Sequence, residues 1–193
     1  MTTADMKGAA LAYAKRGWPV FPCKTDKSPY TEHGVLEATV DPEQIEEWWT
    51  RHPGANIGLH AGEAGFVILD YDPGSDKGEV ANALGEEPPV TQLIARTPRG
   101  GTHEYYFRPD GADLVASTTA PFAEHVDVRS FHGYVLLPPS RTKDGAYVWE
   151  SEEKPATASP ALLDACRKPI EKDPARFEWL IEPDMPEHIG LAI

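Results

Sequence analysis

The chain has few of the residues that cross-link a fold or bind zinc, since its 193 residues include only two cysteines. Cys23 and Cys166 lie far apart in the sequence and form neither a CxxC zinc site nor a disulfide framework. No zinc is therefore expected, and a reduced cytoplasmic setting is predicted. The N-terminus lacks the apolar core of a signal peptide, and no run approaches the roughly 20 apolar residues of a membrane span.

Positive charge is also scarce: the chain has 18 Lys and Arg against 31 Asp and Glu, a net charge of −13. Proteins that coat nucleic acid without sequence preference gain their affinity by neutralising phosphates, so this charge argues against that class. Any contact with nucleic acid must be confined to a local part of the surface.

The residues that are present predict a folded α+β protein with a mainly antiparallel sheet. Apolar residues make up 40% of the chain and charged residues 25%, which is close to the usual globular mix. The 19 prolines favour short strands and turns over a helical bundle. One helix is expected at the N-terminus, capped by Thr3 or Asp5, and a second is expected from Pro42 to His52, capped by Asp41.

Short apolar runs separated by turn residues predict three β-hairpins. Each hairpin is expected to pair two neighbours in the sequence: 56–60 with 66–72, 92–97 with 102–108, and 124–129 with 134–137. Single strands are expected at 18–23 and 147–150. From Ser151 the composition changes, so residues 1–150 are expected to be the main domain and residues 151–193 a linker and helical tail.

The sharpest local feature is the segment FVILDYDP, an apolar strand that ends in Asp70 and Asp72. Alternation along a strand sends both carboxylates to the same face. Two adjacent negative charges repel each other unless a cation joins them, which suits a hard divalent ion such as Mg²⁺ or Mn²⁺. The alternative is a strand-end turn whose aspartates are simply solvated.

A second carboxylate motif, HVDVRS, places Asp127 and Arg129 on one face of a later strand. Asp127 could complete a ligand set for two metal ions of the kind used in phosphoryl transfer, with Arg129 suited to a phosphate oxygen. The alternative is an ordinary Asp–Arg surface pair.

Between these motifs lies TPRGGTH, in which Gly100 and Gly101 permit close approach of the backbone. Backbone amides flanked by Arg99 and His103 suit a triphosphate. The alternative is a turn that only connects two strands.

Together these motifs make residues 10–150 resemble the N-terminal domain of bifunctional primase-polymerases of the archaeo-eukaryotic primase superfamily, found in phage and plasmid replication proteins. The resemblance rests on nine segments in the family's order: AYAKRGWPVFPC, the Lys27-Ser28-Pro29 step, ATVDPEQIEEWW, ANIGLHAG, ILDYD, TPRGGTH, VDVRS, GYVLLPPS and GAYVWE. It implies an RRM-like catalytic sheet joined to a small N-terminal α/β subdomain.

The resemblance also implies site residues. Asp70, Asp72 and Asp127 match the family's catalytic metal ligands, and Thr102 and His103 match its contact to the incoming nucleotide's triphosphate. Lys27, Arg99 and Arg129 are the expected basic partners of that nucleotide. Two departures stand out: isolated cysteines cannot build the zinc stem of archaeal relatives, and the segment 109–122 is poor in glycine, which leaves its role open.

The function implied is primer synthesis and extension on single-stranded DNA from NTPs or dNTPs, with Mg²⁺ or Mn²⁺, in the cytoplasm of a bacterial host. A helicase domain is expected downstream in the same polypeptide. One alternative is a metal-dependent nuclease or phosphatase, which would activate water with the same carboxylates. Another is a non-catalytic RRM-like nucleic-acid-binding module, which would need stacking aromatics on its sheet; the candidates are Tyr105, Tyr106 and Phe107.

Overall fold

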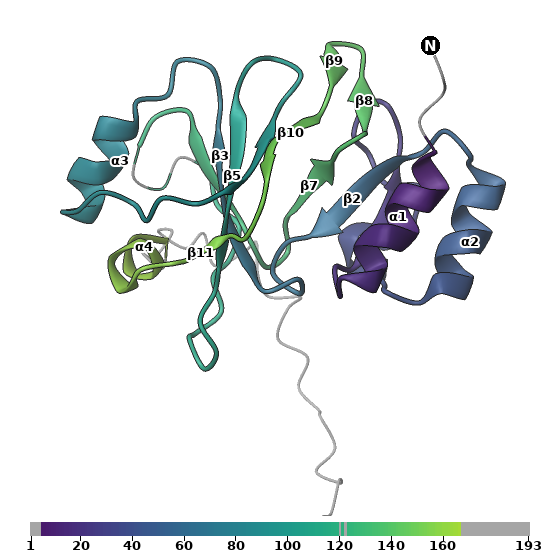
Figure 1. The fold of residues 1–193 in the computed structure, drawn as a ribbon, viewed down its shortest axis with the longest axis horizontal. Coiled ribbons are helices and arrows are strands. Elements are labelled where there is room, and N and C mark those ends of the chain that lie inside the picture. Colours follow the sequence, from purple (N-terminus) through teal and green to yellow (C-terminus); the bar gives the residue numbers. More distant parts are fainter. Residues whose placement is uncertain (1–4, 120, 122, 167–193) are drawn as a thin grey trace, which may run out of the picture.

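The chain forms two mainly antiparallel sheets that lie side by side, with helices on the outer side of each (Figure 1). The computed structural model describes residues 5–119, 121 and 123–166. The small sheet has the order β1-β2-β7 and the large one the order β10-β4-β5-β3-β6, with β11 pairing in parallel beside β5. The strands are β1 (Val20–Cys23), β2 (Asn56–His60), β3 (Phe66–Tyr71), β4 (Leu93–Arg96), β5 (Thr102–Phe107), β6 (Val126–Arg129), β7 (Tyr134–Leu137), β10 (Val148–Glu152), β11 (Ala156–Thr157), and the separate hairpin of β8 (Arg141–Thr142) and β9 (Gly145–Ala146).

The helices divide between the two sheets. Helices α1 (Met6–Lys15) and α2 (Pro42–Arg51) lie beside the small sheet, and α3 (Lys77–Leu84) and α4 (Pro160–Cys166) lie next to each other on the large sheet (Figure 1). A short 3₁₀ helix spans Gly34–Glu37. The predicted α+β class with mostly antiparallel sheets is therefore confirmed. No helix in the described part of the chain is long and apolar enough to cross a bilayer.

The first two helices begin where the sequence predicts. The Asp5 side chain accepts a hydrogen bond from the Gly8 amide, and the Asp41 side chain accepts one from the Glu43 amide. Each bond satisfies one of the amides that a helix N-terminus leaves unpaired, and Pro42 in the first turn lacks such an amide altogether. Thr3, the other predicted cap, lies outside the described residues.

Two of the three predicted hairpins are wrong, because their strands belong to different sheets. Strand β2 pairs with β1 and β7, while β3 pairs with β5 and β6. Two short crossovers, at residues 61–65 and 130–133, thus join the sheets, and after β7 the chain returns to the large sheet through the segment that carries β8 and β9. The two crossovers pack against each other: a Cβ on Gly62 would lie 2.6 Å from the backbone nitrogen of Phe131. The third hairpin, β4 with β5, is confirmed, and the Thr97 amide closes its turn on the Gly101 carbonyl.

Two hydrophobic clusters hold the layers together. One joins α1, α2 and the small sheet to residues of the large sheet such as Ile68 and Tyr105. The other lies under α3 and α4, where Val80, Leu162 and Leu163 pack on the opposite face of the large sheet. That face is therefore closed to ligands, and the site must lie on the side that meets the small sheet.

The packed body continues past residue 150. Strand β10 runs to Glu152, β11 pairs beside the end of β5, and α4 buries Leu162 and Leu163 in the second cluster. The segment expected to begin a linker at Ser151 is thus held by strand pairing and by burial of apolar side chains. The rest of the expected tail, from residue 167 on, lies outside the described residues.

A buried histidine at the end of β2 predicts a pH-dependent stability. His60 is 2% exposed, and its Nδ1 accepts a hydrogen bond from the Glu63 amide. Burial lowers the pKa of His60, and nearby His132 lowers it further, against the opposing effect of Glu63. The unfolded chain therefore takes up the proton first as the pH falls below about 6.5.

We expect the free energy of unfolding to decrease between about pH 6.5 and the lower pKa of the folded protein. Urea unfolding across this range should show the decrease, and it should be smaller in His60→Gln, which has no proton to gain. An equal decrease in both proteins would assign the pH dependence to other groups.

Candidate active site

Three polar side chains lie in a row across three adjacent strands of the large sheet. In the register, Asp70 on β3 is opposite Asp127 on β6 and opposite His103 on β5. Residues directly opposite each other on paired strands share a face, so all three point to the same side. Arg129, two residues after Asp127, lies on that side as well. Strand alternation thus brings the polar residues of three separate motifs together.

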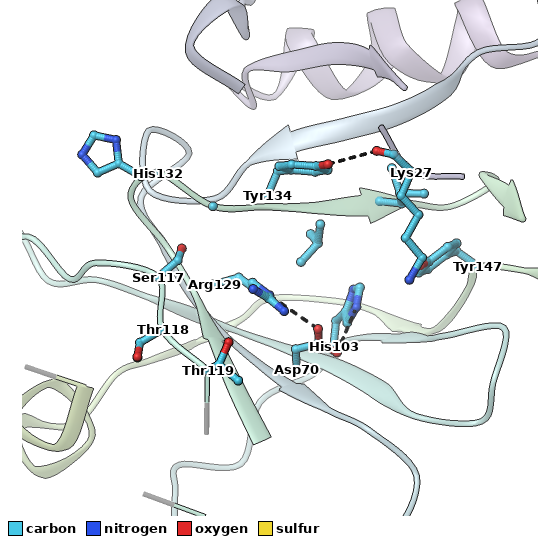
Figure 2. Close-up of a pocket in the computed structure, with 13 residues that line it drawn as sticks. Lys27, Asp70, His103, Ser117, Thr118, Thr119, Arg129, His132, Tyr134 and Tyr147 are labelled. Carbon is cyan, nitrogen blue, oxygen red and sulfur yellow. Dashed lines mark hydrogen bonds and ion pairs between the residues drawn. The ribbon is translucent and has the colours of Figure 1, made fainter. Parts of the chain in front are cut away.

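Asp70 is the centre of this row (Figure 2). His103 Nε2 lies 3.3 Å from its Oδ1, and Arg129 Nε lies 3.6 Å from its Oδ2. Burial would raise the pKa of Asp70, but the hydrogen bond and charge of His103, with the charges of Arg129 and Lys27, more than offset burial and hold that pKa below its usual value. The carboxylate is therefore ionised at neutral pH although its side chain is only 18% exposed.

The other two predicted carboxylates also contact arginines. A second nitrogen of Arg129 lies 2.5 Å from Asp127 Oδ2, so one guanidinium spans Asp70 and Asp127. Asp72, just past the end of β3, lies 3.1 Å from a guanidinium nitrogen of Arg99 and is more exposed than Asp70. Carboxylate oxygens fit a hard divalent cation such as Mg²⁺ or Mn²⁺. Within residues 5–119, 121 and 123–166, no group of three or more His, Cys, Asp or Glu side chains converges to hold a metal ion.

Two adjoining cavities open above this face. The larger, about 460 Å³, extends from the row on the large sheet to β7 of the small sheet (Figure 2). The smaller, about 120 Å³, lies over the β4–β5 turn and reaches Asp72 and Arg99. Both cavities are lined by Lys27, Asp70, His103, Arg129 and Tyr147. In the larger cavity Asp70 is the one carboxylate among the lining residues, beside Lys27 and Arg129, whereas the smaller cavity has three cations and also Asp72 and Asp144.

His103 has an unused hydrogen-bonding atom in this site. The residue is 4% exposed and lines both cavities. Its Nδ1 atom is buried and has no hydrogen-bond partner among the described residues. A buried polar atom without a hydrogen bond destabilises the folded protein. A ligand that formed a hydrogen bond with Nδ1 would remove this penalty.

Lys27 is the cation that the small-sheet side contributes to the site. It lies in the loop after β1 and has a left-handed backbone, with φ of +76°. Its carbonyl accepts a 3.0 Å hydrogen bond from the Tyr134 hydroxyl on β7, and its amide donates to the Lys24 carbonyl. These two bonds hold a conformation that a residue with a side chain rarely adopts.

The structure brings most of the predicted site residues together. Lys27, Asp70, His103 and Arg129 line both cavities, Asp72 and Arg99 line the smaller one, and Asp127 lies beside Asp70. Thr102 differs: it precedes His103 on β5, so its side chain points to the opposite face, and it lines neither cavity.

Several cavity residues carry no sequence signal that could have found them. Tyr147 lies with its ring centroid 5.7 Å from that of His103, and burial raises its pKa to about 12, so the phenol is a neutral donor. Residues 117–119 supply one wall: Ser117 Oγ accepts a hydrogen bond from the Ser130 amide, and the Thr118 backbone pairs with Val128. In the larger cavity, the polar residues that the sequence did not predict are Ser117, Thr118, Thr119, His132, Tyr134 and Tyr147.

The aromatic trio considered as a stacking surface does not form one. Tyr105 and Tyr106 are at most 1% exposed and lie in different hydrophobic clusters, on opposite faces of the sheet. Only Phe107 reaches the surface, at 37% exposure. A module that binds single strands by stacking needs several exposed rings on one face. This part of the sheet serves packing instead.

A comparison with known families identifies the family of the chain. The sequence model described as the N-terminal domain of bifunctional DNA primase/polymerases matches residues 10–162. No curated protein matches the chain. The matched range includes both sheets, every cavity residue named above and the first residues of α4.

Proposed function

Because the chain belongs to the family of bifunctional DNA primase/polymerase N-terminal domains, we propose that it synthesises and extends primers on single-stranded DNA from NTPs or dNTPs. The observation that carries this proposal is the ionised Asp70, held between His103 and Arg129 in a cavity whose other polar side chains are cations, histidine and hydroxyls. A triphosphate needs cations around it, and phosphoryl transfer needs a carboxylate at the reacting phosphate.

The reaction proposed is attack of a 3′-hydroxyl on the α-phosphate of the nucleotide. A new bond forms between the 3′-oxygen and phosphorus, the bond to the β-phosphate oxygen breaks, and pyrophosphate leaves. Lys27, Arg99, His103 and Arg129 all line the smaller cavity. We propose that the three cations contact phosphate oxygens and that His103 donates a hydrogen bond to one. Fixed positive charges of this kind stabilise the charge that develops in the transition state.

Members of this family generally depend on divalent metal ions. We propose Mg²⁺ or Mn²⁺ as the ion, with Asp70 and Asp72 as ligands from one cavity and Asp127 as the third carboxylate beside Asp70. When bound, the ion supplies charge neutralisation at the phosphoryl oxygens and favours ionisation of the attacking hydroxyl.

The RRM-like character of the large sheet is part of the proposal. Strands β3, β4, β5 and β6 have the spatial order β4-β5-β3-β6, with α3 connecting β3 to β4. This is the arrangement of a split βαβ unit with an added hairpin strand. From the family resemblance alone we also propose a role in phage or plasmid replication with a helicase domain in the same polypeptide.

A single assay tests the function. The protein is incubated with single-stranded template, labelled primer, each nucleotide set, and Mg²⁺ or Mn²⁺. Lengthening of the primer, and new primers on unprimed template, are expected. Shortening of the labelled strand would instead support the metal-dependent nuclease, and an unchanged strand with every metal and nucleotide would refute nucleotidyl transfer.

A further prediction concerns Tyr134 as a positioning residue. Tyr134→Phe removes the hydroxyl that holds the Lys27 carbonyl and leaves the ring in place. Loss of one hydrogen bond, about 0.5–1.5 kcal/mol, should raise the KM for nucleotide roughly two- to ten-fold with a smaller change in kcat. Steady-state kinetics at saturating template would measure it.

Two variants separate this role from a purely structural one. If Tyr134 acts through Lys27, the double variant Tyr134→Phe/Lys27→Met should be no worse than Lys27→Met alone. Lys24→Met is the matched control, because Lys24 lies in the same loop but lines none of the cavities described here. Additive losses would mean that Tyr134 acts on the substrate independently of Lys27.

A further inference from the structure

A third cavity continues outward from the proposed active site. It has a volume of about 630 Å³ and lies between the loop after β1 and the β8–β9 hairpin. It shares Lys27 with both site cavities, and it shares Thr142 and Asp144 with the smaller one. The three cavities are therefore contiguous. We call the outer one the hairpin groove; it is lined by Thr25, Asp26, Lys27, Arg141, Thr142, Lys143 and Asp144.

The cations of the hairpin groove form no close ion pair among the described residues. Lys27, Arg141 and Lys143 have no carboxylate at ion-pair distance, although the charge of Lys27 acts on Asp70, whereas five arginines elsewhere do: Arg16, Arg51, Arg96, Arg99 and Arg129. In a chain with a net charge of −13, unpaired cations gathered in one groove indicate an anionic ligand.

The groove also contains two acids, and within the described part of the chain neither forms an ion pair with these cations. The Asp26 carboxylate accepts hydrogen bonds from the amide and the hydroxyl of Ser28. Those bonds turn it toward its own loop. Asp144 lines the smaller site cavity as well and lies at the junction between that cavity and the groove.

One buried asparagine fixes both walls of the groove. Asn56 on β2 is 3% exposed, and its Nδ2 donates to the Lys24 carbonyl at 3.1 Å and to the Arg141 carbonyl at 2.7 Å. Its Oδ1 accepts the Arg141 amide at 2.8 Å. A buried amide must be hydrogen-bonded to be tolerated, and here all three bonds join the two walls. The groove is therefore formed before any ligand arrives, which lowers the cost of binding.

We propose that the hairpin groove binds the sugar-phosphate backbone of the single strand on which the active site works. This inference rests on the proposed function. Besides Asp26 and Asp144, the lining contains cations and hydroxyls but no aromatic ring, so it offers nothing on which a base can stack. Contacts to phosphate alone hold a strand without reading its sequence, as a primase acting along a template requires. The larger site cavity differs, since Tyr134, Tyr147 and two histidines line it.

The test measures the salt dependence of single-strand binding. Fluorescence anisotropy with labelled oligo(dT) is recorded from about 0.05 to 0.15 M salt for the wild type and for Arg141→Gln/Lys143→Gln. Each lost phosphate contact should reduce the slope of log K against log salt by about 0.7, so the double variant should lose about 1.4 and bind more weakly at low salt. Both side chains are exposed, and the fold should be unaffected.

Lys154→Gln is the matched control. Lys154 is an exposed lysine at the far end of β10 from the hairpin, and its removal should change neither slope nor affinity. The KM for nucleotide at saturating template should also be unchanged in the double variant.

Three results would overturn the proposal. These are an unchanged slope and affinity in the double variant, equal losses in Lys154→Gln, or a raised nucleotide KM with unchanged DNA affinity, which would assign the groove to the triphosphate. Absence of any single-strand binding by the wild type at low salt would also overturn it. Primer extension by the wild type is measured separately. If the wild type extends no primer but the double variant still loses single-strand binding, the proposed function is refuted while the groove remains a single-strand binding site.

Discussion

Replacing Asp70 by asparagine is expected to reduce nucleotidyl transfer by at least about a thousand-fold, which corresponds to roughly 4 kcal/mol of lost transition-state stabilisation. The amide keeps the shape of the side chain but loses the charge that His103 and Arg129 face. Primer extension under single-turnover conditions measures the loss. Asp72→Asn and Asp127→Asn should also be severely impaired if both carboxylates serve the same ions.

Controls separate this loss from unfolding. The thermal unfolding midpoint of Asp70→Asn should stay near that of the wild type, because the amide can still hydrogen-bond to His103. Asp110→Asn, in an exposed turn after β5, is the matched control and should be fully active. Near-normal extension by Asp70→Asn would remove this residue from the site, whatever the other two variants do.

Replacing Gly101 by alanine is expected to have the largest effect on stability. A Cβ at this position would lie 2.1 Å from the Tyr71 carbonyl oxygen and 3.2 Å from Thr97 Oγ1. The carbonyl belongs to the backbone between Asp70 and Asp72, so it cannot move away without shifting both carboxylates. We expect a loss of about 2–4 kcal/mol in the free energy of unfolding, together with most of the activity.

Urea unfolding measures the loss in Gly101→Ala. Gly54→Ala is the control, because a Cβ on Gly54 meets nothing within 4 Å and its backbone is not left-handed. That variant should be as stable as the wild type. A stable Gly101→Ala that keeps its activity would show that the β4–β5 turn can move away from β3.

The row of Asp127, Asp70 and His103 illustrates what the sequence can predict. Alternation along each strand gives the face of every side chain once the strand is recognised, and all three motifs lie on clear strands. The same rule places Thr102 on the opposite face from His103. The interpretation that joined these two residues as nucleotide contacts came from the family resemblance, and for the Thr102 side chain the strand geometry does not support it.

Tyr134 and Tyr147 illustrate what the sequence could not predict. Tyr134 lies on β7 and Tyr147 directly before β10, and these strands belong to different sheets. The sheet to which a strand belongs depends on partners far along the chain. The crossovers at 61–65 and 130–133 are as short as hairpin turns, so local patterning cannot distinguish a turn back from a passage to the other sheet. The hairpin groove could not be predicted for the same reason.

The long-range pairing of β2 with β7 affects how the protein must fold. Ile57 pairs with Leu137, and β6, which completes the row of polar residues, lies between them in the sequence. Closing the long loop between β2 and β7 costs conformational entropy, which is offset only when the two strands have paired. Folding rates decrease as a larger share of the contacts joins residues far apart in the sequence. During synthesis, β1 and β2 must wait for β7 to leave the ribosome. The cavity between the sheets is therefore among the last parts of the molecule to form, and a nascent chain cannot bind nucleotide there before β7 has been made.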